Sequence, residues 1–186
     1  MILLVGLGNP TPDSNDNRHN IGFKIIDAIN QKFSLSKQKP KFKGLLTTGN
    51  ISNKKVYAIK PLTFMNNSGI CIRELIEYFK INSEDVIVFH DDLDLDFTKI
   101  KAKFGGSSAG HNGITSIDKF IGKEYSRVRI GIGKPDSKIQ VSDFVLTNFT
   151  DEEKIKLEKV IQNIIESMPI LIDKKLDLFS STVNNK

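Results

Sequence analysis

The stretch VGLGNPTPDSNDNRHNIGF, residues 5–23, joins an apolar run to an amphipathic segment and predicts the fold class. The run ILLVGL (2–7) is continuously apolar and ends in glycine, which is typical of a buried parallel strand. The segment NIGFKIIDAINQKF (20–33) repeats its isoleucines at the spacing of a helix face. Because alternating strands and helices mark an α/β fold, this beginning favours that class.

The same alternation continues along the chain, with runs typical of strands and apolar stripes typical of helices. The expected strands are 43–51, 55–61, 85–91, 98–104 and 126–133, and the expected helices are 66–81, 112–121, 140–149 and 150–168. We predict a single α/β domain over residues 1–186, with a mixed, largely parallel, twisted sheet flanked by helices on both faces. The tail from about Ser180 is expected to be flexible.

Some helix boundaries carry their own signals. Residues 66–68 (NNS) offer capping side chains at the start of one helix. Thr150 and Glu153 have the spacing of a capping box at the start of the last one. Pro169 is expected to kink or end that helix, because proline has no N–H donor.

The composition is that of an ordinary globular protein, with 39% hydrophobic and 26% charged residues among 186. No apolar run is long enough to span a bilayer, and we expect no signal peptide. The single cysteine, Cys71, excludes an internal disulfide and a cysteine zinc cluster and agrees with a reducing cytoplasm. The net charge of +5 suits a polyanionic partner, although a lysine-rich composition can also reflect genomic bias.

Two motifs resemble ligand-binding loops but lack residues that those loops require. GLGNPTP (6–12) follows a strand, as a dinucleotide-binding turn does, but Thr11 replaces the third glycine and the prolines prevent a helix start. DLDLDF (92–97) begins like a calcium loop, but Phe97 and Lys103 replace the required glycine and glutamate. The first function is excluded and the second is disfavoured, while a looser divalent-cation site among these aspartates stays open.

Polar side chains follow three of the expected strands. Asn9, Asn66 and Asp91 each come after an apolar run. Because ligand crevices in open α/β sheets form at the carboxyl ends of the strands, we expect these side chains to meet at one edge. Each alone is better explained as a turn or cap residue, but together they predict a polar site.

A histidine can supply base chemistry to such a site. His19 stands at the mouth of the first helix, and an ordinary histidine is mostly neutral at pH 7 and can accept a proton. A carboxylate such as Asp91 would fix its tautomer and stabilise the imidazolium. Because the chain has no G-x-S-x-G nucleophile, a His–Asp pair points to activation of water. The alternative is that His19 is a capping or surface residue. The other histidines, His90 and His111, also adjoin an Asn or Asp.

Two further features suit an anionic ligand. The loop FGGSSAGHNGI (104–114) runs into a helix N-terminus, where backbone N–H groups bind anions, although an ordinary mobile loop explains it as well. In TKIKAKF (98–104), alternation places Lys99, Lys101 and Lys103 on one face of a strand, about 6.6 Å apart.

Arg127 and Arg129 share one face of the strand 126–133 by the same parity. If this strand lies beside the lysine-bearing strand, the two form a basic patch that fits phosphates. An edge strand that uses lysine to prevent aggregation explains the lysines equally well.

Six motifs, in order over nearly the whole chain, resemble those of the bacterial peptidyl-tRNA hydrolase family: VGLGNP, RHNIGF, KPLTFMNNSG, HDDLDL, GHNG and RVRIGIG. The resemblance implies a monomeric, cytoplasmic esterase that hydrolyses the bond between a peptide and the 3′ end of tRNA. It also implies peptidyl-tRNA as the partner, with no metal, cofactor or membrane involved.

Carried over by motif, the resemblance assigns roles to individual residues. His19 of RHN would be the general base, and Asp91 of HDDLD would support it. Asn66 and Asn112 would bind the substrate and place the water or the carbonyl. Asn9 would help to distinguish blocked from free aminoacyl ends.

The resemblance also implies that Phe64 lines the substrate site and that tRNA phosphates bind Lys101, Lys103 and Arg129. One position departs from the family, which usually has a tyrosine five residues before the histidine, where this chain has Ser14. We place Ser14 among the substrate-binding residues by its position, and a neighbouring side chain would substitute for the tyrosine.

Two other functions remain open from the sequence. A non-enzymatic RNA-binding member of the same fold would keep the basic row and would not need the His–Asp pair. A metal-dependent hydrolase would use the aspartate cluster and would lose its activity in excess chelator. The proposed polar site residues are all present, which favours the metal-independent enzyme.

Overall fold

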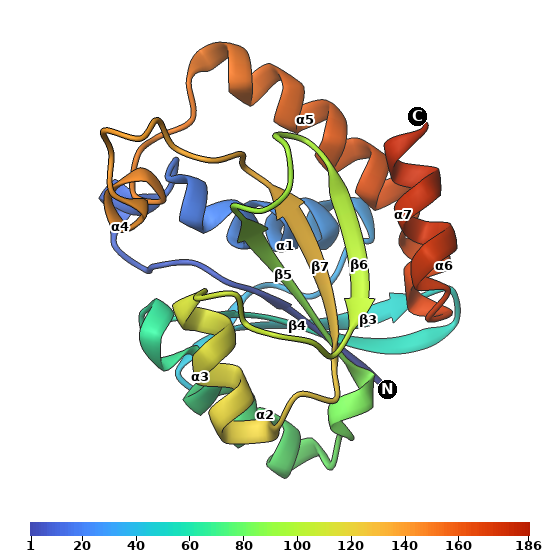
Figure 1. Cartoon of the computed structure of the whole chain (residues 1–186). Helices are drawn as coiled ribbons and strands as arrows, with labels where there is room; N and C mark the ends of the chain where they lie inside the picture. The colour runs from blue at the N-terminus through green and yellow to red at the C-terminus, as the bar shows by residue number, and fades with distance from the viewer.

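The computed structural model describes residues 1–186 and shows one twisted sheet with helices on both faces (Figure 1). The strands are β1 (Ile2–Gly6), β2 (Lys39–Lys41), β3 (Gly44–Ile51), β4 (Lys54–Pro61), β5 (Val86–Asp92), β6 (Ile100–Phe104) and β7 (Ser126–Gly131). Their order in the sheet is β2-β3-β4-β1-β5-β7-β6. The helices are α1 (Ile21–Lys32), α2 (Ser68–Phe79), α3 (Asn112–Ile121), α4 (Val141–Phe144), α5 (Asp151–Glu166), α6 (Met168–Ile172) and α7 (Leu176–Asn184). None of the helices is both long enough and apolar enough to cross a membrane.

The centre of the sheet is parallel and its edges are antiparallel. β1 pairs in parallel with β4 and β5, and β5 pairs in parallel with β7. β2 with β3, β3 with β4, and β6 with β7 pair antiparallel. β1 is buried along its whole length, because helices cover both faces at the centre, and its sequence is therefore continuously apolar. The predicted α/β fold with a mixed sheet is confirmed.

Two layers of helices bury the two faces of the sheet. α1, α5, α6 and α7 pack on one face, and α2 and α3 pack on the other, where Figure 1 draws them below the sheet. Alternate side chains of β1 divide between the two cores: Leu4 enters the first and Leu3 enters the second. The two helix layers cover the faces of the sheet and not the carboxyl ends of its central strands. A cavity lies at the carboxyl end of β5.

Two boundary signals in the sequence are confirmed. The α5 capping box forms, because Thr150 Oγ1 accepts a hydrogen bond from the Glu153 backbone N–H (3.2 Å) and a carboxylate oxygen of Glu153 accepts from the Thr150 N–H (3.0 Å). Pro169 lies in the first turn of α6, directly after α5 ends.

Two other helix predictions are wrong in detail. Residues 66–68 provide no side-chain cap for α2, because a 3₁₀ turn (Met65–Asn67) leads directly into the helix and Ser68 Oγ donates to the Met65 carbonyl instead. The helix expected over 140–149 is reduced to the single turn of α4. Residues 145–147 form turns instead of a continued helix, with the Thr147 N–H donating to the Phe144 carbonyl at 3.0 Å. The Val145 carbonyl accepts a hydrogen bond from the His19 N–H at 2.9 Å.

The end of the chain is helical, in contrast to the flexible tail expected from about Ser180. α7 buries Phe179 and Val183. Asn184 Oδ1 accepts a hydrogen bond from the Ile100 N–H (3.0 Å), and Asn184 Nδ2 donates to the Ile100 carbonyl (2.8 Å). Because β6 is an edge strand, α7 satisfies backbone groups that no neighbouring strand pairs. The polar composition of the tail does not predict that it pairs with the edge of β6.

Candidate active site

The three polar residues that follow strands lie at one edge of the sheet. Asn9 follows β1, Asn66 follows β4 and Asp91 is the last but one residue of β5, and these three strands are neighbours. Asn9 Oδ1 accepts a hydrogen bond from the Met65 N–H at 2.9 Å, which joins the ends of β1 and β4. Asn20, just before α1, exchanges two hydrogen bonds of 2.9 Å with the Asn9 backbone. Asn9 is therefore fixed in place by two segments that are distant in the sequence.

His19 and Asp91 meet at this edge. His19 lies in the 3₁₀ turn Arg18–Asn20, and its Nδ1 is 2.8 Å from Asp91 Oδ2 and 3.0 Å from Asp91 Oδ1. The two residues are buried, with exposed fractions of 8% and 2%. The structure therefore provides the His–Asp contact that activation of water requires.

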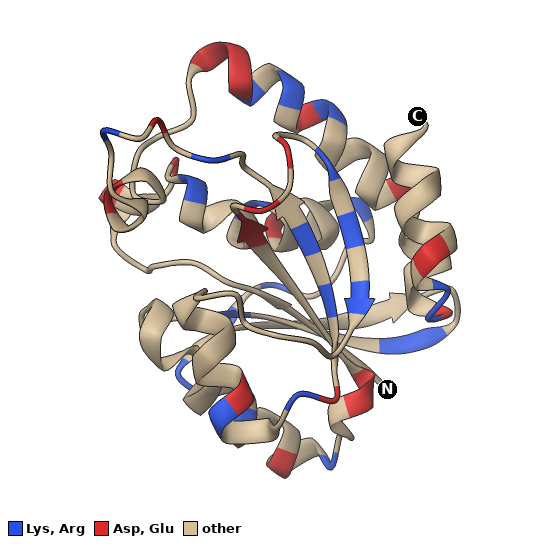
Figure 2. Cartoon of the chain, in the orientation of Figure 1, with Lys and Arg blue, Asp and Glu red and all other residues tan.

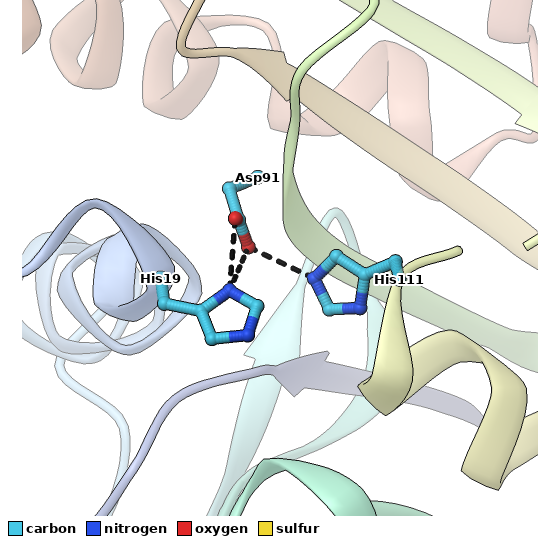
Figure 3. Close-up of side chains that lie close together, drawn as sticks. All are labelled: His19, Asp91 and His111. Atoms are coloured by element: carbon cyan, nitrogen blue, oxygen red, sulfur yellow. Dashed lines mark hydrogen bonds and ion pairs between the residues drawn. The ribbon is translucent and has the colours of Figure 1, made fainter. Parts of the chain in front are cut away.

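A third side chain, missed by the sequence analysis, completes the cluster. His111 Nε2 lies 2.9 Å from Asp91 Oδ1, so that the carboxylate stands between two imidazole rings (Figure 3). The His19 and His111 ring centroids are 4.9 Å apart. His111 precedes α3 directly, in the position of an N-cap, and this is the one signal in the sequence that its ring is held in place.

The hydrogen bonds define the tautomers of both histidines. His111 Nδ1 accepts hydrogen bonds from the N–H groups of Gly113 (3.1 Å) and Ile114 (3.3 Å), so the proton of this neutral ring is on Nε2, which donates to Asp91. Since Asp91 accepts, His19 donates from Nδ1 and carries a lone pair on Nε2, which points away from the carboxylate (Figure 3). The Nε2 atom of His19 is thus free of a contact with Asp91.

Burial and neighbouring histidines act in opposite directions on the pKa of Asp91. Burial favours the neutral acid, but His111 and His19 outweigh it and hold the pKa of Asp91 below its usual range, so the carboxylate is ionised. Burial is the main cause that lowers the pKa of His90 to about 3. His90 is therefore a neutral ring, which donates from Nδ1 to the Asp91 carbonyl (2.8 Å) and packs edge-on against His111.

Arg18, next to His19, anchors this part of the site. Its guanidinium makes a bidentate pair with Glu153 at 2.8 and 3.0 Å and lies over the rings of Phe144 and Phe149. Its backbone N–H donates to the Thr147 carbonyl at 3.0 Å. These contacts join the 3₁₀ turn that carries His19 to the residues from α4 to the start of α5. They could not be predicted from local sequence patterns, because Arg18 and Glu153 are far apart in the chain.

The cluster opens into a cavity of about 350 Å³. Its walls come from β5 and the loop after it, the loop before α3, and α4 with the residue that follows it. The lining residues are His19, His90, Asp91, Asp92, Leu93, Asp94, Ser108, Ala109, Gly110, His111, Asn112, Val141, Ser142 and Val145. A neighbouring hollow, lined by Asn66 and also by Asn112, continues along α2 and α3. Asn112 therefore lies between the cavity at His19 and this second hollow.

Two remaining substrate-binding predictions have different outcomes. Phe64 has a positive φ of 63° and a half-exposed ring beside the 3₁₀ turn that carries Asn66. Ser14 is buried, its hydroxyl is hydrogen-bonded to Thr11 Oγ1 at 2.6 Å, and it does not line the cavity. A substrate contact by Ser14 stays a prediction.

The predicted basic patch is present in part. β6 and β7 are neighbours, with Lys101 opposite Arg129, and Figure 2 shows basic positions along both strands. Lys101 and Lys103 are exposed, and Arg129 is half-buried with its Nε 2.7 Å from Asp92 Oδ2. These three predicted phosphate-binding residues therefore lie on one side of the sheet edge.

Arg127 does not belong to the patch, although its parity predicts that it should. Its side chain is buried beneath α3, where it donates to Asp118 at 2.9 Å and to the Ser107 carbonyl at 2.7 Å. The alternation correctly predicts that Arg127 and Arg129 share one face of β7. The position of α3 over the Arg127 end of this strand could not be predicted from the strand sequence alone.

The residues that could hold a metal are His19, Asp91 and His111, whose ligand atoms lie within 4.8 Å of one another. Histidine nitrogens and a carboxylate oxygen are a donor set that zinc accepts. In this structure the same atoms are paired with one another as hydrogen-bond donors and acceptor. The acidic run 92–97 is not such a cluster, because Asp92 accepts from the Asp94 N–H and from Arg129.

Comparison with known proteins gives a consistent result. The family model described as peptidyl-tRNA hydrolase matches residues 3–186. The peptidyl-tRNA hydrolase of Pelagibacter ubique is 80% identical over the full length of both chains, and that of Bacillus subtilis is 41% identical over 94% of this chain and 93% of its own. A crystal structure of peptidyl-tRNA hydrolase from Acinetobacter baumannii superposes with a TM-score of 0.92 at 34% identity, over 99% of this chain and 94% of that one.

The open α/β sheet, the buried His–Asp–His cluster at its carboxyl edge and these matches together place the chain among the hydrolases. The match over nearly the whole chain and the high identity to relatives along its full length make the assignment specific. The chain belongs to the peptidyl-tRNA hydrolase family.

Proposed function

We propose that this chain hydrolyses the ester bond between a peptide, or an N-blocked amino acid, and the 3′ end of tRNA, and so recycles tRNA from prematurely released peptidyl-tRNA. The observation that carries the proposal is the contact of 2.8 Å between His19 Nδ1 and Asp91 in a member of this family. The contact leaves the second ring nitrogen of His19 available to a water molecule.

In the proposed reaction His19 is the general base. Its Nε2 takes a proton from water as the water oxygen attacks the ester carbonyl. The imidazolium that forms lies against the ionised Asp91 in a buried site, where the attraction is stronger than in water. The same proton then passes from Nε2 to the departing 3′ oxygen, which restores the neutral base. General base catalysis of this kind contributes about 10²- to 10⁴-fold.

Asp91 and His111 keep the base in its active form. Asp91 accepts from His19 Nδ1 and excludes the tautomer that would protonate Nε2. His111 donates a second hydrogen bond to Asp91 and is itself fixed by the first turn of α3. The carboxylate is therefore held between two donors and cannot rotate away from His19 without losing one of them.

Asparagine side chains bind and place the substrate in this proposal. Asn112 lines the cavity of the base and the neighbouring hollow, which suits a group that binds the acyl part near the ester carbonyl. Asn66 lines that hollow, Phe64 directly precedes the 3₁₀ turn that carries Asn66, and both contact the peptide in this proposal. Asn9, whose Oδ1 is already occupied by the Met65 N–H, presents its amide Nδ2 to the N-terminal blocking group.

The tRNA part of the substrate lies over β6 and β7. Lys101, Lys103 and Arg129 bind its phosphates, since cations on a strand face neutralise a polyanion without reading its sequence. The reaction as proposed uses no metal or cofactor. The protein acts as a monomer in this proposal, because one chain supplies every side chain of the cluster. It acts in the cytoplasm, where tRNA is found.

The test compares release of an N-acetylated aminoacyl group from tRNA with release of the unblocked one. Wild-type protein should release the blocked group many-fold faster, and Asn9→Ala should reduce this preference more than it reduces tRNA binding. Binding of tRNA with no release of the blocked group would contradict the proposal and would instead support a non-enzymatic RNA-binding protein.

A further inference from the structure

A second hollow, of about 220 Å³, lies where the start of β6 meets α5 and α7, away from the base. Its charged lining residues are all lysines: Lys99, Lys156, Lys159 and Lys186. No aspartate or glutamate lines it. We call this feature the lysine hollow. Four cations around one depression repel one another unless an anion lies between them.

The positive charge of the lysine hollow is poorly compensated. Lys99 and Lys159 form no ion pair with any acidic side chain. Lys156 reaches Glu152 only at 3.6 Å and at the surface, where such a pair contributes little. Lys186 alone has a close partner, Glu166 at 2.7 Å. Three cations are therefore available to an external anion.

The floor of the hollow is rigid. Val183 and Asn184 of α7 belong to the lining, and they are fixed by burial and by the two hydrogen bonds to Ile100. The backbone of Lys99 is held by a hydrogen bond of 2.8 Å from the Gly131 N–H to its carbonyl. The lysines thus project from elements in fixed positions, so their spacing is a property of the fold.

The lysine hollow adjoins the start of the basic row on β6. Lys99, which lines the hollow, immediately precedes the strand that carries Lys101 and Lys103. Figure 2 shows basic positions running from α5 to β6 and down that strand. Because Lys99 pairs with the carboxyl end of β7, the hollow lies on the edge of the sheet at which the active-site cavity opens. Several separate cations along one edge of the sheet fit a phosphate backbone better than a single small anion.

We propose that the lysine hollow is a second binding site for the tRNA phosphate backbone, which holds a part of the molecule away from its 3′ end. The inference rests on the function proposed above and extends it. Lys101, Lys103 and Arg129 bind the backbone close to the reacting end, and Lys99, Lys156 and Lys159 bind it further along. The hollow therefore contributes to recognition of a full-length tRNA and contributes nothing to a short fragment.

The experiment uses a triple variant, Lys99→Gln, Lys156→Gln and Lys159→Gln, and two substrates with the same ester. One substrate is full-length N-acetyl-aminoacyl-tRNA, and the other is a CCA trinucleotide that carries the same acyl group. The variant should raise the KM for tRNA about tenfold or more, while kcat and the KM for the trinucleotide stay unchanged. The slope of log affinity against log salt for deacylated tRNA should fall by about 2 to 3.

The matched control removes three exposed lysines at the opposite side of the sheet: Lys37→Gln, Lys39→Gln and Lys55→Gln. It makes the same change in net charge and should leave both KM values near those of the wild type. Equal effects of the two triple variants would show a response to net charge alone and would overturn the inference. An unchanged KM for tRNA in the hollow variant would overturn it as well.

Two further measurements separate the possible failures. If wild-type protein does not hydrolyse the ester, the proposed function fails, while the binding of deacylated tRNA still tests the hollow. If the triple variant is unstable, the single variants Lys99→Gln and Lys159→Gln should each lower the salt slope by about 1. No decrease in either single variant would contradict a phosphate contact.

Discussion

His111 contacts Asp91 through Nε2 at 2.9 Å and caps α3 through Nδ1, so one ring joins the carboxylate of Asp91 to a helix terminus. The first contact requires a proton on Nε2, and the second requires Nδ1 to be free of one. The helix thus selects the tautomer that supports Asp91, and Asp91 in turn supports His19.

Replacing His111 should separate its two roles. His111→Ala removes both, and we expect kcat to fall about 10- to 100-fold and the free energy of unfolding to fall by about 1 kcal/mol. His111→Asn keeps a side-chain acceptor for the cap, so it should recover stability but not kcat. Steady-state kinetics and urea unfolding of both variants check this. Full activity in either variant would show that the contact with Asp91 has no role in the reaction.

Asp91→Asn should remove most of the activity with little change in fold. An amide can donate to His19 Nδ1 and so favour the tautomer with a proton on Nε2, which cannot accept one from water. We expect kcat to fall about 10²- to 10⁴-fold with a nearly unchanged KM for tRNA. Asp94→Asn is the control, because Asp94 lines the same cavity without touching a histidine, and it should stay within a few-fold of the wild type. Similar losses in both variants would point to the charge of the cavity rather than to the contact.

His90 should make the protein less stable as the pH falls. Its ordinary pKa is 6.5, and burial lowers the pKa of His90 to about 3, so between these values the unfolded chain binds a proton that the folded chain does not. The free energy of unfolding therefore decreases as the pH falls from about 6.5 towards 3. His90→Asn keeps a donor to the Asp91 carbonyl but does not titrate, and its slope should be smaller by about one proton. Urea unfolding at several pH values measures both slopes, and identical slopes would show that His90 is not buried in its neutral form.

Activity should survive removal of divalent ions. His19, Asp91 and His111 form a donor set that could hold a metal, but the proposed reaction uses the same atoms as a hydrogen-bonded base. Protein treated with excess chelator and dialysed should keep its kcat with N-acetyl-aminoacyl-tRNA. Loss of activity that added zinc restores would replace the general-base mechanism with a metal-dependent one.

Local patterns were enough to predict the fold. The continuous apolar run of β1 reflects burial on both faces, and the stripe of α1 reflects contact with one face. The rule that polar residues gather at the carboxyl ends of parallel strands brought Asn9 and Asp91 to one edge, and the structure agrees. These features depend on neighbours in the sequence or on a general property of sheets.

The features that the sequence did not show depend on which helix covers which side chain. His111 reaches Asp91 only because α3 begins beside β5. Arg127 has the parity of a phosphate-binding residue but is covered by α3 and paired with Asp118. The tail is polar in composition, yet Asn184 uses that polarity to pair the edge of β6. Contacts of this kind are set by packing between distant segments.

The rate of ester hydrolysis by His19→Ala under single-turnover conditions, with enzyme in excess over N-acetyl-aminoacyl-tRNA, tests the central claim most directly. If Nε2 of His19 takes the proton from water, the rate should fall about 10²- to 10⁴-fold while tRNA still binds. Hydrolysis at a rate close to that of the wild type would show that another group, and not His19, activates the water.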